Sequence, residues 1–452
     1  MKLLFNPVWI YHIRKVGSSY LARRKLRPQH CLLETSKRIL SRTALKGDNM
    51  KLTSRRMIVG TVGTVAVCLL AVAFASGQAA QQPRPQMAEE VFKNVQILKG
   101  IPVDEFMDTM GMFAAALSLN CIDCHTPESS GSWDKFGDDT PLKRTARRMM
   151  LMVSTINRDN FAGVRNVSCY TCHRGDLRPK IVPNLALQYS VPVEDANEVE
   201  IVPISGGPSV DQILDKYIQA LGGTQRLANF TSFTGKGTYI GFDTEQTKVP
   251  VEVFAKAPAQ RTTIVRPRIG DSVRVYDGRA AWVAGSDKPV PLLSLTGGNL
   301  DGAKIDAALS FPTQARIKQM FAQWRVGATS INDSEVRVIQ GTNPRQPPVN
   351  FYFDENTGLL VRTLRFVDTP VGRVPTQTDY SDYRDVSGIK IPYKWTATWT
   401  DGQATTELSE AQVNVRSTPR DSPDRPRRGP GRKFEATAPS SFVFYEAGAR
   451  FD

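Results

Sequence analysis

Two pentapeptides of the same form constrain this chain more than any other feature. They are Cys-Ile-Asp-Cys-His at residues 121–125 and Cys-Tyr-Thr-Cys-His at residues 169–173. In the spacing Cys-x-x-Cys-His, two thiols can add to the two vinyl groups of one haem while the histidine binds its iron. A redox dithiol or half of a zinc site also uses Cys-x-x-Cys, but neither requires the adjacent histidine. We therefore predict a c-type cytochrome with two covalently bound haem c groups.

The motifs assign most of the predicted haem contacts directly. The thioether bonds are expected from Cys121, Cys124, Cys169 and Cys172, and one axial iron ligand per haem from His125 and His173. A low-spin electron carrier needs a second axial ligand on each iron. The chain has four histidines, and the other two, His12 and His30, lie in a segment that we expect the mature protein to lack. Methionine thioether remains as the second ligand, and it raises the reduction potential.

Methionines precede each motif on segments with helical periodicity. Before the first motif, a helix is predicted over residues 103–117, and its apolar face contains Met110. Met110 is therefore predicted to face the first haem. Before the second motif, a helix is predicted from about Pro141 to Ile156, and its periodicity leaves Met149 and Met152 as alternatives.

Four segments together give a resemblance to a known family. They are Lys93–Met110, Asn120–His125, Ala146–Asn157 and Val167–Gly175, which contain both motifs and parts of the helices before them. Residues 88–178 thereby resemble the cytochrome c subunits of photosynthetic reaction centres. In that family each haem packs on a helix that donates a methionine, and a turn and Cys-x-x-Cys-His follow. The resemblance implies Met110 as the ligand of the first haem and Met149 as the ligand of the second.

The sequence departs from that family in two ways. The photosynthetic subunits usually carry four haems, whereas this chain has two attachment motifs, and a large β-rich region follows them. The resemblance therefore implies electron transfer with a redox donor and acceptor, one of them a membrane-bound complex, without implying that this complex is photosynthetic.

The N-terminal residues indicate export and explain most of the charge. Residues 1–56 hold fourteen Lys and Arg against two acidic residues, which accounts for +12 of the net charge of +14. The remainder is nearly neutral, so we predict no nucleic-acid partner. We interpret residues 1–49 as a mis-assigned or dispensable extension and residues 50–80 as a signal peptide for the general secretory route, with an apolar run at 57–75. The alternative is an uncleaved anchor at 57–75; either reading predicts a periplasmic protein.

The second half of the chain changes in pattern. Residues 179–208 are predicted to be an extended linker, and residues 209–415 a β-domain that begins with a capped helix over 209–221. Alternating apolar residues and the turns Asp277-Gly278, Asn356-Thr-Gly358 and Asp401-Gly402 predict antiparallel hairpins up to residue 415. Residues 416–452 are predicted to be a basic, disordered tail.

The predicted fold class is accordingly multidomain α + β. A mainly helical two-haem cytochrome domain at 88–178 is followed by a curved antiparallel β-sheet, a half-barrel, with a covering helix. The β-domain also faintly resembles the half-barrels of lipoprotein carriers such as the lipoprotein-localisation factors. The segments that carry this resemblance are Asp211–Leu221, Asp277-Gly278, Asp354–Arg362, Tyr380–Tyr383 and Gly388–Pro392. It implies a concave apolar face able to hold a lipid acyl chain or a partner's segment, and a simple docking domain remains the alternative.

These features predict periplasmic electron transfer by a carrier that is not an enzyme. One alternative is a two-haem peroxidase, which needs an acid or base beside an open iron position; Glu105, Asp108 and Asp159 are the candidates. A second alternative makes the β-domain primary, as a lipid or lipoprotein carrier with the haem region as a redox sensor. Between residues 210 and 415 the sequence has no Cys or His, so no catalytic constellation is predicted there.

Overall fold

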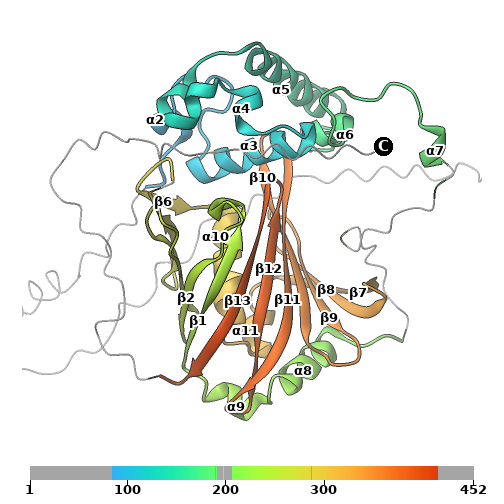
Figure 1. Ribbon diagram of the computed structural model, residues 1–452. Coiled ribbons are helices and arrows are strands. Elements are labelled where there is room, and N and C mark those ends of the chain that lie inside the picture. Colours follow the sequence, from blue (N-terminus) through green and yellow to red (C-terminus); the bar gives the residue numbers. More distant parts are fainter. Residues whose placement is uncertain (1–83, 189, 191–196, 198–205, 287, 416–452) are drawn as a thin grey trace, which may run out of the picture. The chain divides into compact units, whose positions relative to one another are not determined.

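The computed structural model describes residues 84–188, 190, 197, 206–286 and 288–415 (Figure 1). The predicted N-terminal extension 1–49, the signal or anchor 50–80 and the basic tail 416–452 lie outside these residues, and the linker 179–208 is described only in part. Among the described residues, no helix combines the length and the apolar character that a membrane span requires.

The haem-motif region consists of helices and short turns. Its elements are α2 (Ala88–Val91), α3 (Val103–Leu117), α4 (Cys121–Cys124), η1 (Pro127–Gly131), η2 (Trp133–Gly137), α5 (Pro141–Asn160), α6 (Cys169–His173) and α7 (Leu185–Gln188). Helix α3 begins after Pro102 with two acids in its first turn, which suits the positive end of the helix dipole. Helix α5 begins with Pro141, and the Thr140 side chain accepts a hydrogen bond from the Lys143 N–H.

The β-domain is one open antiparallel sheet of thirteen strands in the order β6-β5-β4-β3-β2-β1-β13-β12-β11-β10-β9-β8-β7 (Figure 1). The strands are β1 (Ser232–Gly241), β2 (Val249–Lys256), β3 (Gln260–Val265), β4 (Ser272–Tyr276), β5 (Ala281–Ala284), β6 (Leu292–Leu295), β7 (Gln323–Ile331), β8 (Ser334–Thr342), β9 (Val349–Asp354), β10 (Leu360–Thr369), β11 (Gly372–Val386), β12 (Ile389–Trp399) and β13 (Gly402–Val413). Its helical elements are α8 (Val210–Ala220), α9 (Thr224–Ala228), η3 (Phe242–Thr244), α10 (Gly297–Leu309) and α11 (Gln314–Lys318). The large antiparallel sheet confirms the coarse fold prediction for this half.

Local sequence explains the main features of this domain. Ser209 and Gln212 form the predicted capping box of α8, and the buried face of that helix packs into the main core of the sheet. Alternating apolar residues on β2 produce an alternating burial pattern. The three predicted turns each join two paired strands: β4 with β5, β9 with β10, and β12 with β13.

The prediction of strands throughout residues 222–415 was wrong at four helical elements: α9, η3, α10 and α11. Gly297 and Gly298 at the start of α10 give this segment the sequence pattern of a turn. In the structure, the Thr296 side chain makes no capping hydrogen bond. The cap comes from a distant residue instead. Asp104 on α3 accepts hydrogen bonds from the Thr296 N–H at 2.6 Å and from its hydroxyl at 2.9 Å. A local pattern cannot reveal a cap supplied from almost two hundred residues away.

The same contacts join the haem-motif region to the sheet within the compact unit 80–452. Asp104 is almost fully buried, and Asn299 donates a hydrogen bond of 2.6 Å to Asp108 one turn further along α3. Gly111 is also buried on this helix, and a Cβ atom there would lie 2.8 Å from the Thr400 hydroxyl. Glycine therefore permits α3 to approach the β12–β13 turn closely.

Candidate haem sites

The first motif lies on a single capped turn. Ser118 ends α3 in the left-handed conformation, and Asn120 then caps α4. The Asp123 N–H donates to the Asn120 side chain at 3.2 Å, and the Asn120 N–H donates to the Asp123 carboxylate at 2.8 Å. This reciprocal cap holds the peptide helical from Cys121 to Cys124, so the two thiols, three residues apart, lie on the same side of the turn.

The His125 imidazole is oriented by backbone and by packing. Its Nδ1 lies 3.1 Å from the Phe136 carbonyl oxygen, and its ring packs edge-on against the Phe136 ring with centroids 4.9 Å apart. Since a carbonyl only accepts, Nδ1 carries the proton and Nε2 keeps a free lone pair. Burial, helped by the charge of Lys143, lowers the pKa of His125 to about 4, so the imidazole is neutral at physiological pH.

The second motif repeats this arrangement with different supports. The Ser168 N–H donates to the Thr171 hydroxyl at 3.0 Å at the start of α6. His173 Nδ1 lies 3.0 Å from the Asp176 carbonyl oxygen, which again leaves Nε2 free. After His173 the chain turns through Arg174 and Gly175, both with positive φ, and Gly175 N–H donates to Ala116 on α3.

Two supporting residues were not singled out from the sequence. Thr140, which caps α5, donates through its hydroxyl to the Cys124 carbonyl at 2.6 Å. Asn157, buried near the end of α5, donates to the Val167 carbonyl at 2.7 Å and accepts from the Val167 N–H at 2.9 Å. Each side chain ties α5 to the backbone beside one attachment motif. The only sequence signal was the position of both polar residues near the ends of the helix between the two motifs.

The predicted methionine ligands lie on the predicted helices. Met110 is half-buried on α3 and packs against an apolar cluster that contains Cys169 and Met150. Met149 is half-buried on α5, while its neighbour Met150 is buried and Met152 is 45% exposed. Met107 on α3 points to a cavity of the β-domain instead. Both ligand assignments stay predictions.

The surroundings of the motif cysteines disfavour a redox dithiol. Burial raises the pKa of Cys121 and Cys124, and it raises the pKa of Cys169 to about 11. A reactive dithiol needs a lowered thiol pKa. No group of three or more metal-binding side chains is found among the described residues.

The residues present fit a covalently attached haem at each motif. Both imidazoles donate the Nδ1 proton to a backbone carbonyl, which is the support that metal-ligating histidines commonly have. Beside the first motif, the buried hydroxyls of Thr126 and Ser129 have no hydrogen-bond partner among the described residues. Buried polar atoms usually have a partner, so these two are available to a polar group of a bound cofactor.

Comparison with known proteins finds relatives of this region. Residues 54–197 match the family model described as the photosynthetic reaction centre cytochrome C subunit. The photosynthetic reaction center cytochrome c subunit of Thermochromatium tepidum is 42% identical over 97 residues, which are 21% of this chain and 23% of that protein. The corresponding subunit of Roseobacter denitrificans is 34% identical over 103 residues, 21% of this chain and 27% of that protein.

These matches confirm the predicted resemblance over the haem-motif region. The chain spans about a quarter of the length of these curated relatives. Solved structures similar over the other half include a LolA superfamily protein from Nitrosomonas europaea, with a TM-score of 0.32 and 14% identity over 47% of this chain and 96% of that one. A DUF1329 family protein from Desulfovibrio piger has a TM-score of 0.33 and 8% identity over 46% and 95%. These two similarities concern the fold alone.

Proposed function

We propose that this protein is a two-haem c-type cytochrome that transfers electrons on the periplasmic side of a membrane. Cys121 and Cys124 would attach one haem, and Cys169 and Cys172 the other. His125 and Met110 would be the axial ligands of the first iron, and His173 and Met149 those of the second. The observation that carries the proposal is the shared geometry of the motifs: a capped turn with two thiols and a histidine whose Nδ1 is held by a carbonyl.

The chain's own residues would keep the ligands in place. The carbonyls of Phe136 and Asp176 fix the two imidazole rings, and Thr140 and Asn157 fix the backbone beside the cysteines. A haem bound there would supply a one-electron couple, Fe(III)/Fe(II). If the imidazole rings and methionine thioethers keep the same positions in both oxidation states, electron transfer has a small reorganisation energy.

The surface near the second motif suits a redox partner. Tyr170 within the motif is 51% exposed, and Val164 before it is 58% exposed. Leu151 and Met152 on α5 are exposed as well, at 55% and 45%. Exposed apolar side chains around one site are typical of a protein-interaction surface. We propose that an electron donor or acceptor, part of a membrane-bound complex, binds here.

The acids that a peroxidase would need are engaged elsewhere. Asp108 accepts a hydrogen bond from Asn299 of the β-domain, and exposed Asp159 pairs with Arg158 at 2.7 Å. Glu105 lies on α3, and burial raises its pKa. Asp108 and Asp159 are thus held by other side chains, which supports the electron carrier more than the enzyme.

The proposal is tested first by mass spectrometry of the exported protein. We expect an added mass of two haems that survives denaturation, and a loss of one haem in each of the variants Cys121→Ser/Cys124→Ser and Cys169→Ser/Cys172→Ser. An unmodified mass in the unaltered protein would end the proposal.

The axial ligands are tested by absorption spectroscopy of the oxidised protein. Methionine-ligated ferric haem has a weak far-red band, which we expect to fall by about half in Met110→Leu and in Met149→Leu, since each removes one of two ligands. Matched controls on the same helices are Met107→Leu and Met152→Leu, which should keep the band. If Met150→Leu loses the band and Met149→Leu keeps it, the second ligand assignment is wrong.

A further inference from the structure

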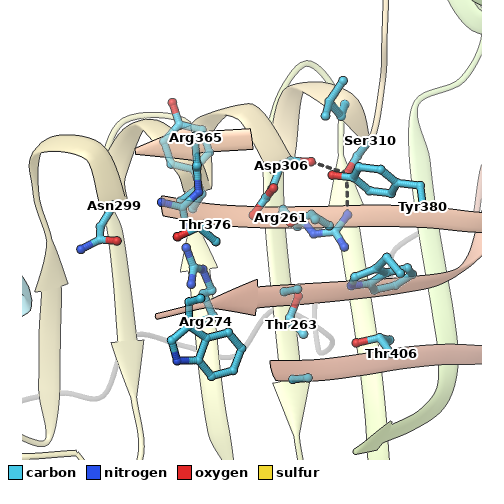
Figure 2. Close-up of a pocket in the computed structure, with 18 of the residues that line it drawn as sticks. Arg261, Thr263, Arg274, Asn299, Asp306, Ser310, Arg365, Thr376, Tyr380 and Thr406 are labelled. Carbon is cyan, nitrogen blue, oxygen red and sulfur yellow. Dashed lines mark hydrogen bonds between the residues drawn. The ribbon is translucent and has the colours of Figure 1, made fainter. Parts of the chain in front are cut away.

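The concave face of the sheet encloses a cavity that electron transfer does not use. Its volume is about 610 Å³, within the range of small-molecule sites, and its lining comes mostly from β3, β4, β10–β13 and α10 (Figure 2). Met107, Asp108 and Trp133 of the haem-motif region complete its wall. Three arginines line this cavity: Arg261, Arg274 and Arg365.

Strand register places the arginines on one face. On β3 and β4, Arg274 pairs with Thr263 and Arg261 pairs with Tyr276. On β10 and β11, Arg365 pairs with Thr376. Directly paired residues point to the same side of a sheet, and all six of these side chains line the cavity. The arginines therefore converge from two separate parts of the sheet.

The positive charge in this cavity is not balanced by ion pairs. Among the described residues, no carboxylate forms an ion pair with any of the three guanidinium groups. Asp306 on α10 attracts Arg261 and Arg365 without forming an ion pair, Asp108 on α3 also attracts Arg365, and Arg274 repels both arginines. Asp243 and Asp401 line the same cavity and form no ion pair with the three guanidinium groups. Burial lowers the pKa of Arg261 and Arg365, although guanidinium groups stay charged in proteins. Buried, unpaired charge is costly, so an anion would be bound favourably here.

Most guanidinium donors in this cluster also lack a protein acceptor. Arg261 donates to the Ser310 hydroxyl at 2.8 Å (Figure 2). Arg365 makes a long contact of 3.5 Å with the Gly298 carbonyl. Arg274 donates to no protein group within the described part of the chain. Each guanidinium has five N–H donors in a planar fork that matches carboxylate or phosphate oxygens. The guanidinium N–H groups without a protein acceptor can therefore bind a carboxylate or a phosphate.

The rest of the lining is largely apolar and aromatic. Trp395 and Trp399 on β12 line the cavity, and the Arg261 guanidinium lies 5.5 Å from the Trp395 ring centroid. Aliphatic side chains extend the apolar wall: Val265, Val283, Leu227, Leu293 and Ile391. An inorganic anion would leave this surface wet, whereas a hydrocarbon chain would bury it at about 25 cal/mol per Å².

We propose that the cavity binds an amphiphilic anion, with its carboxylate or phosphate headgroup held by Arg261, Arg274 and Arg365 and its hydrocarbon chain against the apolar wall. Headgroup and tail are recognised by different residues, so neither a small anion nor a neutral lipid satisfies the whole site. This binding does not depend on the proposed electron transfer, and it gives the β-domain a ligand of its own.

The test is calorimetric titration of the full-length, haem-loaded protein with four probes. Palmitate and hexadecyl phosphate carry the two anionic headgroups, hexadecanol has the tail alone, and inorganic phosphate has the charge alone. We expect both anionic amphiphiles to bind at least about tenfold more tightly than hexadecanol, because charge-assisted hydrogen bonds contribute about 1.5–3 kcal/mol. A preference between palmitate and hexadecyl phosphate identifies the headgroup.

Variants then assign the headgroup contact. Arg274→Gln should reduce palmitate affinity toward that of hexadecanol, while Arg268→Gln, at an exposed arginine on the neighbouring loop, should leave palmitate affinity unchanged. Equal binding of palmitate and hexadecanol by the unaltered protein would overturn the headgroup assignment without any variant. Binding of inorganic phosphate as tight as that of palmitate would overturn the assignment of the tail, and no binding of any amphiphile would overturn both.

Discussion

The haem-motif region and the β-domain are stabilised in different ways. The main core of the β-domain contains 25 buried apolar residues from the sheet and its helices, enough to fill its own interior. The core of the haem-motif region contains eight, and three of these, Val367, Val371 and Val374, belong to the β-domain. The helices around the two motifs therefore depend on partners outside themselves: the β10–β11 hairpin and, by our proposal, two haems.

Their hydrogen bonding differs in the same way. The sheet is held by continuous antiparallel ladders between neighbouring strands. The haem-motif region relies on single side chains that support backbone, such as Thr140 at Cys124, Asn157 at Val167 and Ser118 at Gly175. A small region held by separate contacts opens more easily than a sheet with a large core.

The largest effect is expected when haem attachment is abolished. In a variant with Cys121, Cys124, Cys169 and Cys172 all changed to serine, we expect α3 and α5 to lose protection from amide hydrogen exchange by about two orders of magnitude or more. Strands β1, β2 and β13 should keep their protection, because their core contains no residue of the haem-motif region. Hydrogen exchange followed by mass spectrometry measures both regions at once.

The control for that experiment is the haem-loaded variant Met107→Leu/Met152→Leu, which alters the same two helices without touching a motif. It should exchange like the unaltered protein. If α3 and α5 remain protected in the variant without haem, the helical region is self-sufficient and the contrast between the two regions fails.

A smaller effect is expected from a cavity in the main core of the β-domain. Phe351 is fully buried on β9 and packs against the rings of Phe321 and Trp324. Phe351→Ala should lower the free energy of unfolding of this domain by about 3–5 kcal/mol, through lost burial and the cavity left behind. Denaturant unfolding followed by tryptophan fluorescence measures the change.

The same variant should leave the haem absorption spectrum under native conditions unaltered. The matched control is Phe242→Ala, since Phe242 is 57% exposed and its removal should change stability by less than about 0.5 kcal/mol. Equal losses in the two variants would mean that the main core is not what stabilises the sheet.

The two regions were also predictable from sequence to different degrees. The Cys-x-x-Cys-His spacing suffices to propose Cys121 and His125 as haem contacts, because covalent attachment requires fixed neighbours in sequence. The antiparallel sheet was predictable because alternation and turn residues are local signals. Helix α10 and the arginine cluster were not, since the cap from Asp104 and the meeting of Arg274 with Arg365 depend on residues far apart in the chain. Local sequence patterns specify individual helices and strands, whereas contacts between distant residues follow only from the fold.

The smallest predicted effect tests the junction between the regions through pH. Asp108 accepts a hydrogen bond from Asn299, and Asp104, Arg365 and Asp401 are the charged groups that act on it. Burial raises the pKa of Asp108 from 3.8 to about 7. Between those pH values the folded protein holds a proton that the unfolded chain has released, so the free energy of unfolding falls as pH rises and is lowest above about pH 7.

From pH 5 to pH 8 we expect this group to lower the free energy of unfolding by about 1–2 kcal/mol, a value reduced for partial solvent access. Asp108→Asn cannot ionise, so its stability should change less over that interval, as measured by denaturant unfolding at each pH. Asp134→Asn, at an exposed acid of η2, should retain the full dependence. If Asp108→Asn and the unaltered protein show the same slope, Asp108 is ionised in the folded state at pH 5. The hydrogen bond from Asn299 is then accepted by a charged Asp108 carboxylate rather than by a buried, protonated acid.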